Sequence, residues 1–98
     1  MENKIITLCH NGDVDAIKTA LNHKGALYRM NGIIGCVSNK IKDDDVISTI
    51  KKLLSDDVVV SGYMVSDFAL AALDILNITK YTGNSEKIKA LIKCKFQF

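Results

Sequence analysis

Few side chains in this 98-residue sequence are of the kinds that perform catalysis or hold a metal ion. Cys9, His10 and His23 are the one combination that could supply zinc ligands or a cysteine–histidine nucleophile pair. Neighbouring helical residues such as Cys9 and His10 project about 100° apart, and no fourth ligand accompanies the three. We therefore expect ordinary surface histidines, no bound metal and no cofactor.

The run Asp43-Asp44-Asp45 could in principle bind a hard cation through its carboxylates. It lacks the alternating oxygen positions and the distant glutamate of a calcium-binding loop. Negative charge at the start of a helix is favourable because it faces the positive end of the helix dipole. We expect the run to open a helix. With no phosphate-binding glycine loop and no nucleophile elbow, the chain is not expected to be an enzyme.

Lysines are concentrated near the C-terminus, where Lys87, Lys89, Lys93 and Lys95 could meet nucleic acid. The segment contains no arginine, and its aromatic residues stand at the very end of the chain. A solvated outer helix face is the simpler interpretation. Nucleic-acid binding is kept as an alternative function.

The charge pattern points instead to the middle of the chain. Residues 41–79 carry three basic and seven acidic side chains, whereas residues 80–98 carry five basic and one acidic. Tyrosines near the acidic segment suit an interface core. The predicted partner-binding residues are Asp44, Asp45, Asp56, Asp57, Tyr63, Asp67, Lys80 and Tyr81. The alternative is that the aspartates cap helices and that Arg29 pairs with Asp67 between repeats.

Composition predicts a single folded domain spanning residues 1–98, because 48% of the residues are apolar. The sequence contains no proline, which favours helices. Its start does not resemble a secretory signal, and its most apolar stretch, 58–76, is interrupted by aspartates. Three widely spaced cysteines argue against a disulfide framework. These features predict a cytoplasmic protein without a membrane span.

Apolar periodicity predicts an all-α fold of six short helices in stacked antiparallel hairpins. We expect helices at about residues 3–10, 14–22, 26–39, 43–54, 65–78 and 86–95. In the third helix, Leu27 begins an apolar stripe, and Gly32 and Gly35 could permit close approach of a neighbouring helix. The fifth helix is apolar nearly all round and should be the most buried. Residues 58–60 suit a strand by propensity but have no evident partner, so an extended link is expected.

Two internal matches suggest a helical repeat. Residues 50–54 resemble 88–92 at an offset of 38, and 28–32 resemble 65–69 at an offset of 37. Spacings near 40 are typical of HEAT repeats. The junction from Leu53-Leu54-Ser55-Asp56 to 65–73 resembles the HEAT pattern, with Ser66 where that family has arginine. Residues 9–25 are similar to the close of an ankyrin repeat, which is the alternative.

The HEAT resemblance implies a right-handed stack of helix pairs that binds partners on an extended surface. By size and architecture the chain is similar to the small all-helical immunity proteins of bacterial toxin–immunity pairs. We therefore expect a non-catalytic protein-binding module whose acidic face covers a basic toxin domain. The alternatives are a regulatory or assembly adaptor that uses the same surface, or the nucleic-acid-binding protein described above. We expect neither a membrane nor a small-molecule substrate.

Overall fold

The computed structural model describes residues 3–96, which form the predicted all-α architecture with one small β-hairpin. The helices are α1 (Asn3–His10), α2 (Val14–Leu21), α3 (Ala26–Ser38), α4 (Asp44–Lys52), α5 (Val65–Ile75) and α6 (Glu86–Cys94), with a 3₁₀ turn at Leu53–Ser55 after α4. The strands are β1 (Val59–Val60) and β2 (Tyr63–Met64).

Helix starts are set by side chains that satisfy the free backbone N–H groups of the first turn. Asp13 accepts from the N–H of Ala16 at 2.9 Å and thereby starts α2. Asp43 does the same for α4, as the acidic run predicts, and Ser85 does so for α6. At the other end, α5 stops earlier than the predicted residue 78, because Asn77 adopts a left-handed conformation with φ of 62°.

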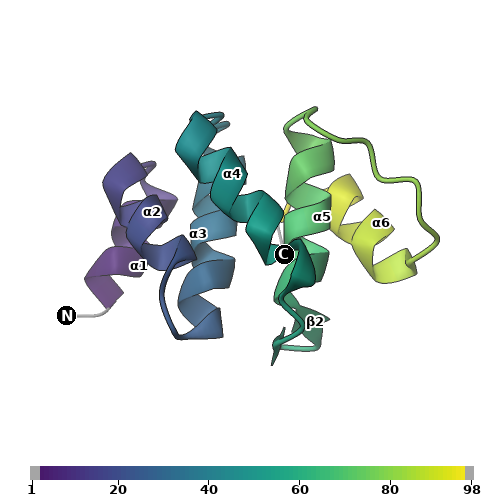
Figure 1. Ribbon diagram of the computed structural model, residues 1–98, viewed down its shortest axis with the longest axis horizontal. Helices are drawn as coiled ribbons and strands as arrows, with labels where there is room; N and C mark the ends of the chain where they lie inside the picture. Colours follow the sequence, from purple (N-terminus) through teal and green to yellow (C-terminus); the bar gives the residue numbers. More distant parts are fainter. Residues whose placement is uncertain (1–2, 97–98) are drawn as a thin grey trace.

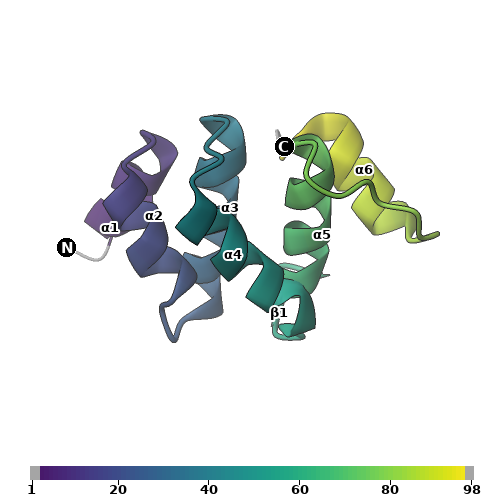
Figure 2. The ribbon, with the colours of Figure 1, turned by 45° about the horizontal axis from the view of Figure 1, so that its top comes forward.

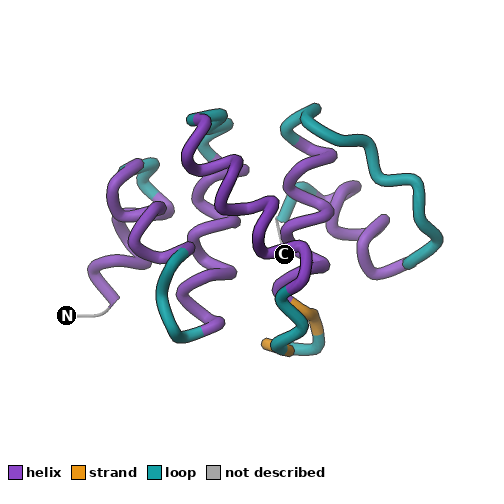
Figure 3. The backbone as a smooth tube through the Cα atoms, viewed as in Figure 1, coloured by secondary structure: helices purple, strands orange, loops and turns teal. Residues whose placement is uncertain are grey.

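The helices form two layers along the longest axis of the molecule, which measures 38 Å (Figure 1). Helices α1, α3 and α5 pack in sequence order, and α2 packs against α4. Helix α6 packs on α5 and lies at the end opposite the N-terminus (Figure 2). The connections α2–α3 and α4–α5 both lie along one edge of the stack, and the second carries the hairpin (Figure 3).

One continuous apolar core runs through all six helices that the structure describes. Helix α5 contributes most to it, as predicted, with even Ser66 and Asp67 largely buried. Of the residue pairs matched by the internal repeat, Ile50 and Ile88 are both buried, whereas Tyr28 is partly buried and its match Val65 is fully buried. The matched positions are therefore only partly equivalent in their burial.

Glycines in α3 let neighbouring helices approach closely, as the sequence suggested. A Cβ at Gly35 would overlap the backbone carbonyl of Cys9 in α1. A Cβ at Gly32 would meet Leu21 at 3.1 Å and Ala20 at 3.2 Å, both of them side-chain atoms of α2. The first contact is with rigid backbone, so Gly35 is the position where a side chain cannot be accommodated without moving a helix.

Replacing Gly35 by alanine should therefore lower the free energy of unfolding by about 1–3 kcal/mol, the usual cost of overpacking. This loss should appear even though alanine is the better helix former by about 1 kcal/mol. Gly32→Ala is the matched control, because its nearest contacts, at 3.1–3.2 Å, are relieved by shifts of a few tenths of an ångström. Urea denaturation followed by circular dichroism measures both. Equal stability of the two variants would show that the α1–α3 contact is not tight.

The segment from 58 to 64 is a β-hairpin, and the prediction of an unpaired extended link was wrong. Val59 pairs with Met64 and Val60 with Tyr63 in antiparallel register. Ser61 and Gly62, at the turn, have φ angles of 54° and 87°. Positive φ at both central residues is what a two-residue hairpin turn requires, because it matches the twist of the strands. The partner strand is only two residues long and directly precedes α5, so it leaves no alternating pattern of its own.

Candidate functional site

Asp44 and Asp45 lie in the first turn of α4 and are exposed. Asp45 lies 3.5 Å from the amine of Lys18 in α2, and its side chain keeps 84% of its accessible surface. Such exposed pairs contribute little to stability. These two carboxylates remain available to a partner.

Asp56 has a structural role that its position after α4 did not reveal. Its carboxylate accepts a hydrogen bond from Arg29 Nε at 2.7 Å. Both side chains are largely buried, with 12% of the Asp56 side chain and 13% of the Arg29 side chain exposed. Arg29 Nη1 also donates to the backbone carbonyls of His23 and Lys24. Arg29 therefore pairs with Asp56, not with Asp67, and ties α3 to the base of the hairpin.

Asp67 is also committed to the fold. It is 9% exposed, and its carboxylate accepts from the N–H of Met64 at 3.0 Å, which joins the hairpin to the start of α5. Asp57, by contrast, is exposed. Of the three aspartates around the hairpin, only Asp57 presents its carboxylate freely to solvent.

Tyr63 is half-buried and packs edge-on against Phe68, with ring centroids 5.5 Å apart. The amine of Lys87 lies 5.7 Å from the Tyr63 ring and donates to the carbonyl of Gly62 at 2.7 Å. The ring therefore joins the hairpin, α5 and α6.

Lys80 and Tyr81 lie in the loop from α5 to α6, away from the hairpin. Tyr81 organises this loop, since its N–H donates to Asp74 at 2.8 Å and its hydroxyl accepts from the N–H of Ser85 at 3.0 Å. Lys80 is exposed. The predicted site residues thus fall into three separate places: the start of α4, the hairpin, and the α5–α6 loop.

An apolar groove between α3 and the hairpin is the feature that the sequence did not indicate. Its volume is about 380 Å³, and Leu27, Met30, Asn31, Ile34, Val60, Ser61, Tyr63 and Phe68 line it. Leu27 begins the predicted apolar stripe of α3, yet it is 53% exposed at the rim. Its position in the apolar stripe was correct, but no helix covers the start of α3. We call this feature the hairpin groove.

Exposed apolar side chains are concentrated on the hairpin segment and at the start of α3, although of these only Leu27 lines the hairpin groove itself. In the part of the chain that the structure describes, the large apolar side chains most open to solvent are Leu27, Leu54, Val58, Val59, Met64 and Ile78. Four of these six belong to the first turn of α3 or to the hairpin segment 58–64. A concentration of this kind is typical of an interaction surface.

The residues considered for metal or nucleophile chemistry lie apart. Cys9 is buried, whereas His10 is exposed and its ring lies 2.8 Å from the side-chain oxygen of Asn31. His23 stacks on Tyr28 and accepts from the N–H of Gly25. Among residues 3–96, no three histidine, cysteine or acidic side chains are grouped as metal ligands would be.

Burial, with a smaller effect of Asp43, raises the pKa of the Cys36 thiol to about 12, which keeps it protonated at neutral pH.

Comparisons with known proteins do not assign this architecture to a family. No protein family, curated protein or solved structure matches the chain significantly. The helices of the described region all fall short of the length and apolarity that crossing a bilayer requires.

Proposed function

We propose that this chain is a non-catalytic protein-binding module, and that the hairpin groove takes an apolar segment of a different protein. The observation that carries the proposal is an open apolar groove with Leu27, the most exposed of its apolar lining residues, at its rim. Leu27, at 53% exposure, is apolar surface that water solvates poorly and that a segment in the groove would cover.

An exposed charge next to the hairpin in sequence suggests which charge the segment should carry. Asp57 is exposed and directly precedes the hairpin, whereas the neighbouring Asp56 is neutralised by Arg29. A basic residue flanking the apolar part of the segment would complement Asp57. Such a charge chiefly accelerates association and makes it sensitive to salt.

The hairpin also bears on the family resemblance. A β-turn element between helix pairs belongs to the ankyrin repeat, whereas a HEAT repeat consists of helices alone. We therefore favour the ankyrin-like alternative for the architecture. Repeat stacks of both kinds bind proteins on an extended surface, so the proposed function does not depend on this choice.

The narrower proposal is an immunity protein that covers a basic toxin domain in the bacterial cytoplasm, with a regulatory or assembly adaptor as the alternative. Free, buried Cys9 and Cys36 are compatible with a reducing compartment. A toxin-like gene next to the gene for this chain, whose product is neutralised on co-expression, supports the narrower proposal. Normal toxicity on co-expression contradicts it.

The test of the groove uses Leu27→Asp, with Ile78→Asp as the matched control at an exposed apolar residue outside the groove. Aspartate at 27 falls in the first turn of α3, where negative charge is favourable, so the fold should persist. A partner captured from the native cell and then purified should bind Leu27→Asp at least about tenfold more weakly than wild type, a loss of about 1.4 kcal/mol. Ile78→Asp should retain wild-type affinity.

Titration calorimetry gives the affinities, and melting temperatures verify that both variants are folded. Equal binding by Leu27→Asp and wild type overturns the groove as the docking site. Concentration-dependent self-association of the pure chain, abolished by Leu27→Asp, overturns the choice of occupant and assigns the groove to a second copy.

A further inference from the structure

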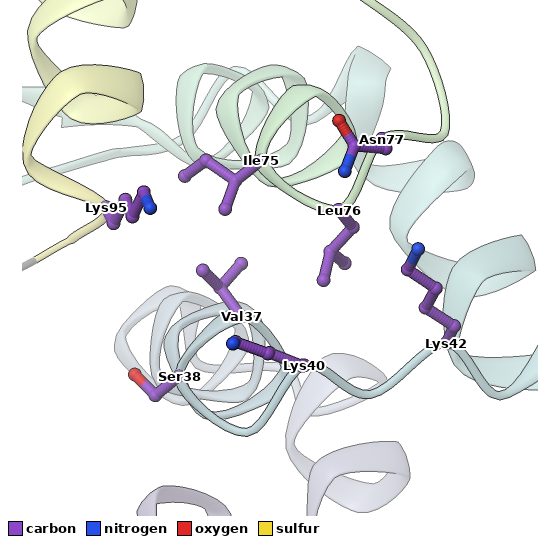
Figure 4. Close-up of a pocket in the computed structure, with 8 residues that line it drawn as sticks. All are labelled: Val37, Ser38, Lys40, Lys42, Ile75, Leu76, Asn77 and Lys95. Carbon is purple, nitrogen blue, oxygen red and sulfur yellow. The ribbon is translucent and has the colours of Figure 1, made fainter.

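A second hollow, unrelated to the hairpin groove, lies where the C-terminal ends of α3, α5 and α6 meet. Its volume is about 400 Å³. Figure 4 shows Val37, Ile75 and Leu76 between the surrounding polar side chains, with Lys40 and Lys42 on the α3–α4 loop and Lys95 after α6. The amide of Asn77 faces the hollow from the end of α5. We call it the lysine pocket.

The lysines of this pocket are not neutralised by the protein. Within residues 3–96, no ion pair or side-chain hydrogen bond engages the amines of Lys40, Lys42 or Lys95. The pocket lining contains no acidic residue. Of the acidic residues nearby in sequence, Asp43 caps α4 and lies 3.8 Å from Lys18, and Asp74 accepts from Tyr81. Asp44 is exposed in the first turn of α4 and is not among the residues that line the pocket.

The backbone around the pocket is unusual for the residues it carries. Lys40, Asn77 and Lys95 have φ angles of 53°, 62° and 54°. A left-handed residue at a helix end is usually glycine and sometimes asparagine, because a Cβ is disfavoured there. Lysine occupies two of these three positions, although it is strained in this conformation. Non-glycine residues in strained conformations cluster at functional sites.

The ends of three helices provide an alternative explanation for the lysines. The C-terminus of a helix carries partial negative charge, which lysine amines stabilise. That effect is confined to the last turn of each helix and does not require three amines around one hollow. Three lysines without an acidic residue among the described lining residues of the hollow favour an external counter-charge.

We propose that the lysine pocket binds a small organic anion carrying two or more phosphate or carboxylate groups. The amines of Lys40, Lys42 and Lys95 neutralise the anionic groups, and the amide of Asn77 donates a hydrogen bond. The apolar surface of Val37, Ile75 and Leu76 accommodates the body of the ligand. The volume is within the range of about 300–1,000 Å³ that small-molecule sites occupy.

The test is a titration of the full, uniformly ¹⁵N-labelled chain at low salt, with three probes in parallel: pyrophosphate, adenosine triphosphate and citrate. Saturable shifts of the backbone amides of Val37, Asn77 and Lys95 are expected with at least one probe. Stronger binding of adenosine triphosphate than of pyrophosphate shows that the apolar floor contributes. Stronger binding of citrate identifies carboxylates as the preferred anionic groups.

Variants separate a defined site from general attraction to a basic protein. Lys40→Gln with Lys95→Gln should weaken binding at least about tenfold. Lys89→Gln with Lys93→Gln removes the same charge from the exposed face of α6 and should have little effect. Removal of Asn77's amide by Asn77→Gly, which tolerates the left-handed backbone, should weaken binding without unfolding the chain.

Three outcomes overturn the proposal. Equal weakening by both lysine pairs shows attraction to net charge only. If no probe saturates at concentrations on the order of 10 mM, the lysines only stabilise the negative ends of the helix dipoles. Tight binding of a single-stranded oligonucleotide, with shifts centred on Lys89 and Lys93, assigns the basic end of the chain to nucleic acid instead.

Discussion

Replacing Leu73 by alanine is expected to lower the free energy of unfolding by about 2–5 kcal/mol, which is the range for removing a large buried side chain. Leu73 is 2% exposed and belongs to α5, which packs against α3, α6 and the 3₁₀ turn after α4. The cavity would therefore open where several elements meet. Because small domains have total stabilities of about 5–15 kcal/mol, the variant could retain little folded population at 37 °C.

Urea denaturation followed by the helical signal at 222 nm measures this loss. Leu70→Ala is the matched control, since Leu70 lies in the same helix but is only partly buried. It should cost clearly less than Leu73→Ala. A loss of a few tenths of a kcal/mol for Leu73→Ala would show that α5 is not the centre of the core.

Replacing Arg29 by methionine should cost about 3 kcal/mol, at the lower end of the range for removing one partner of a buried ion pair. The Asp56 carboxylate would lose its charge partner, and the carbonyls of His23 and Lys24 would lose a donor. The two side chains are about 12–13% exposed, so some solvent remains to offset the loss.

Lys18→Met is the control, because the pair of Lys18 with Asp45 is exposed and should contribute less than about 1 kcal/mol. Asp56→Asn should also lower stability, with little direct effect on partner binding. The opposite pattern, in which Asp56→Asn keeps the melting temperature and weakens binding, would show that Asp56 acts at the interface and that the ion pair is dispensable.

Helix positions could be predicted from the sequence because they depend on local signals. The apolar periodicity and the capping side chains Asp13, Asp43 and Ser85 all act within a few residues of the helix they start. The β-hairpin could also have been recognised, since Ser61-Gly62 is a turn dipeptide between residues of high strand propensity. Strands of two residues each leave too short an alternating pattern to identify by periodicity.

The candidate sites could not be predicted, because each depends on residues that the fold brings together. Arg29 and Asp56 are 27 positions apart, and nothing local indicates that the second is the partner of the first. Leu27 follows the apolar period of α3, and only the absence of a covering helix leaves it exposed. The lysine pocket joins the ends of three helices. The residues on either side of each position in the sequence do not indicate which distant residues it will contact.

The order in which helices pack has a consequence for how quickly the chain should acquire its structure. Helices α1 and α2, α2 and α3, and α5 and α6 are neighbours both along the chain and in space. Contacts of this kind form without closing long loops, so little chain entropy is lost before they stabilise the product. Helical proteins with such local topology typically reach the native state within microseconds to milliseconds. A newly synthesised chain would thus expose the apolar side chains of α5 only briefly, which limits the time available for aggregation.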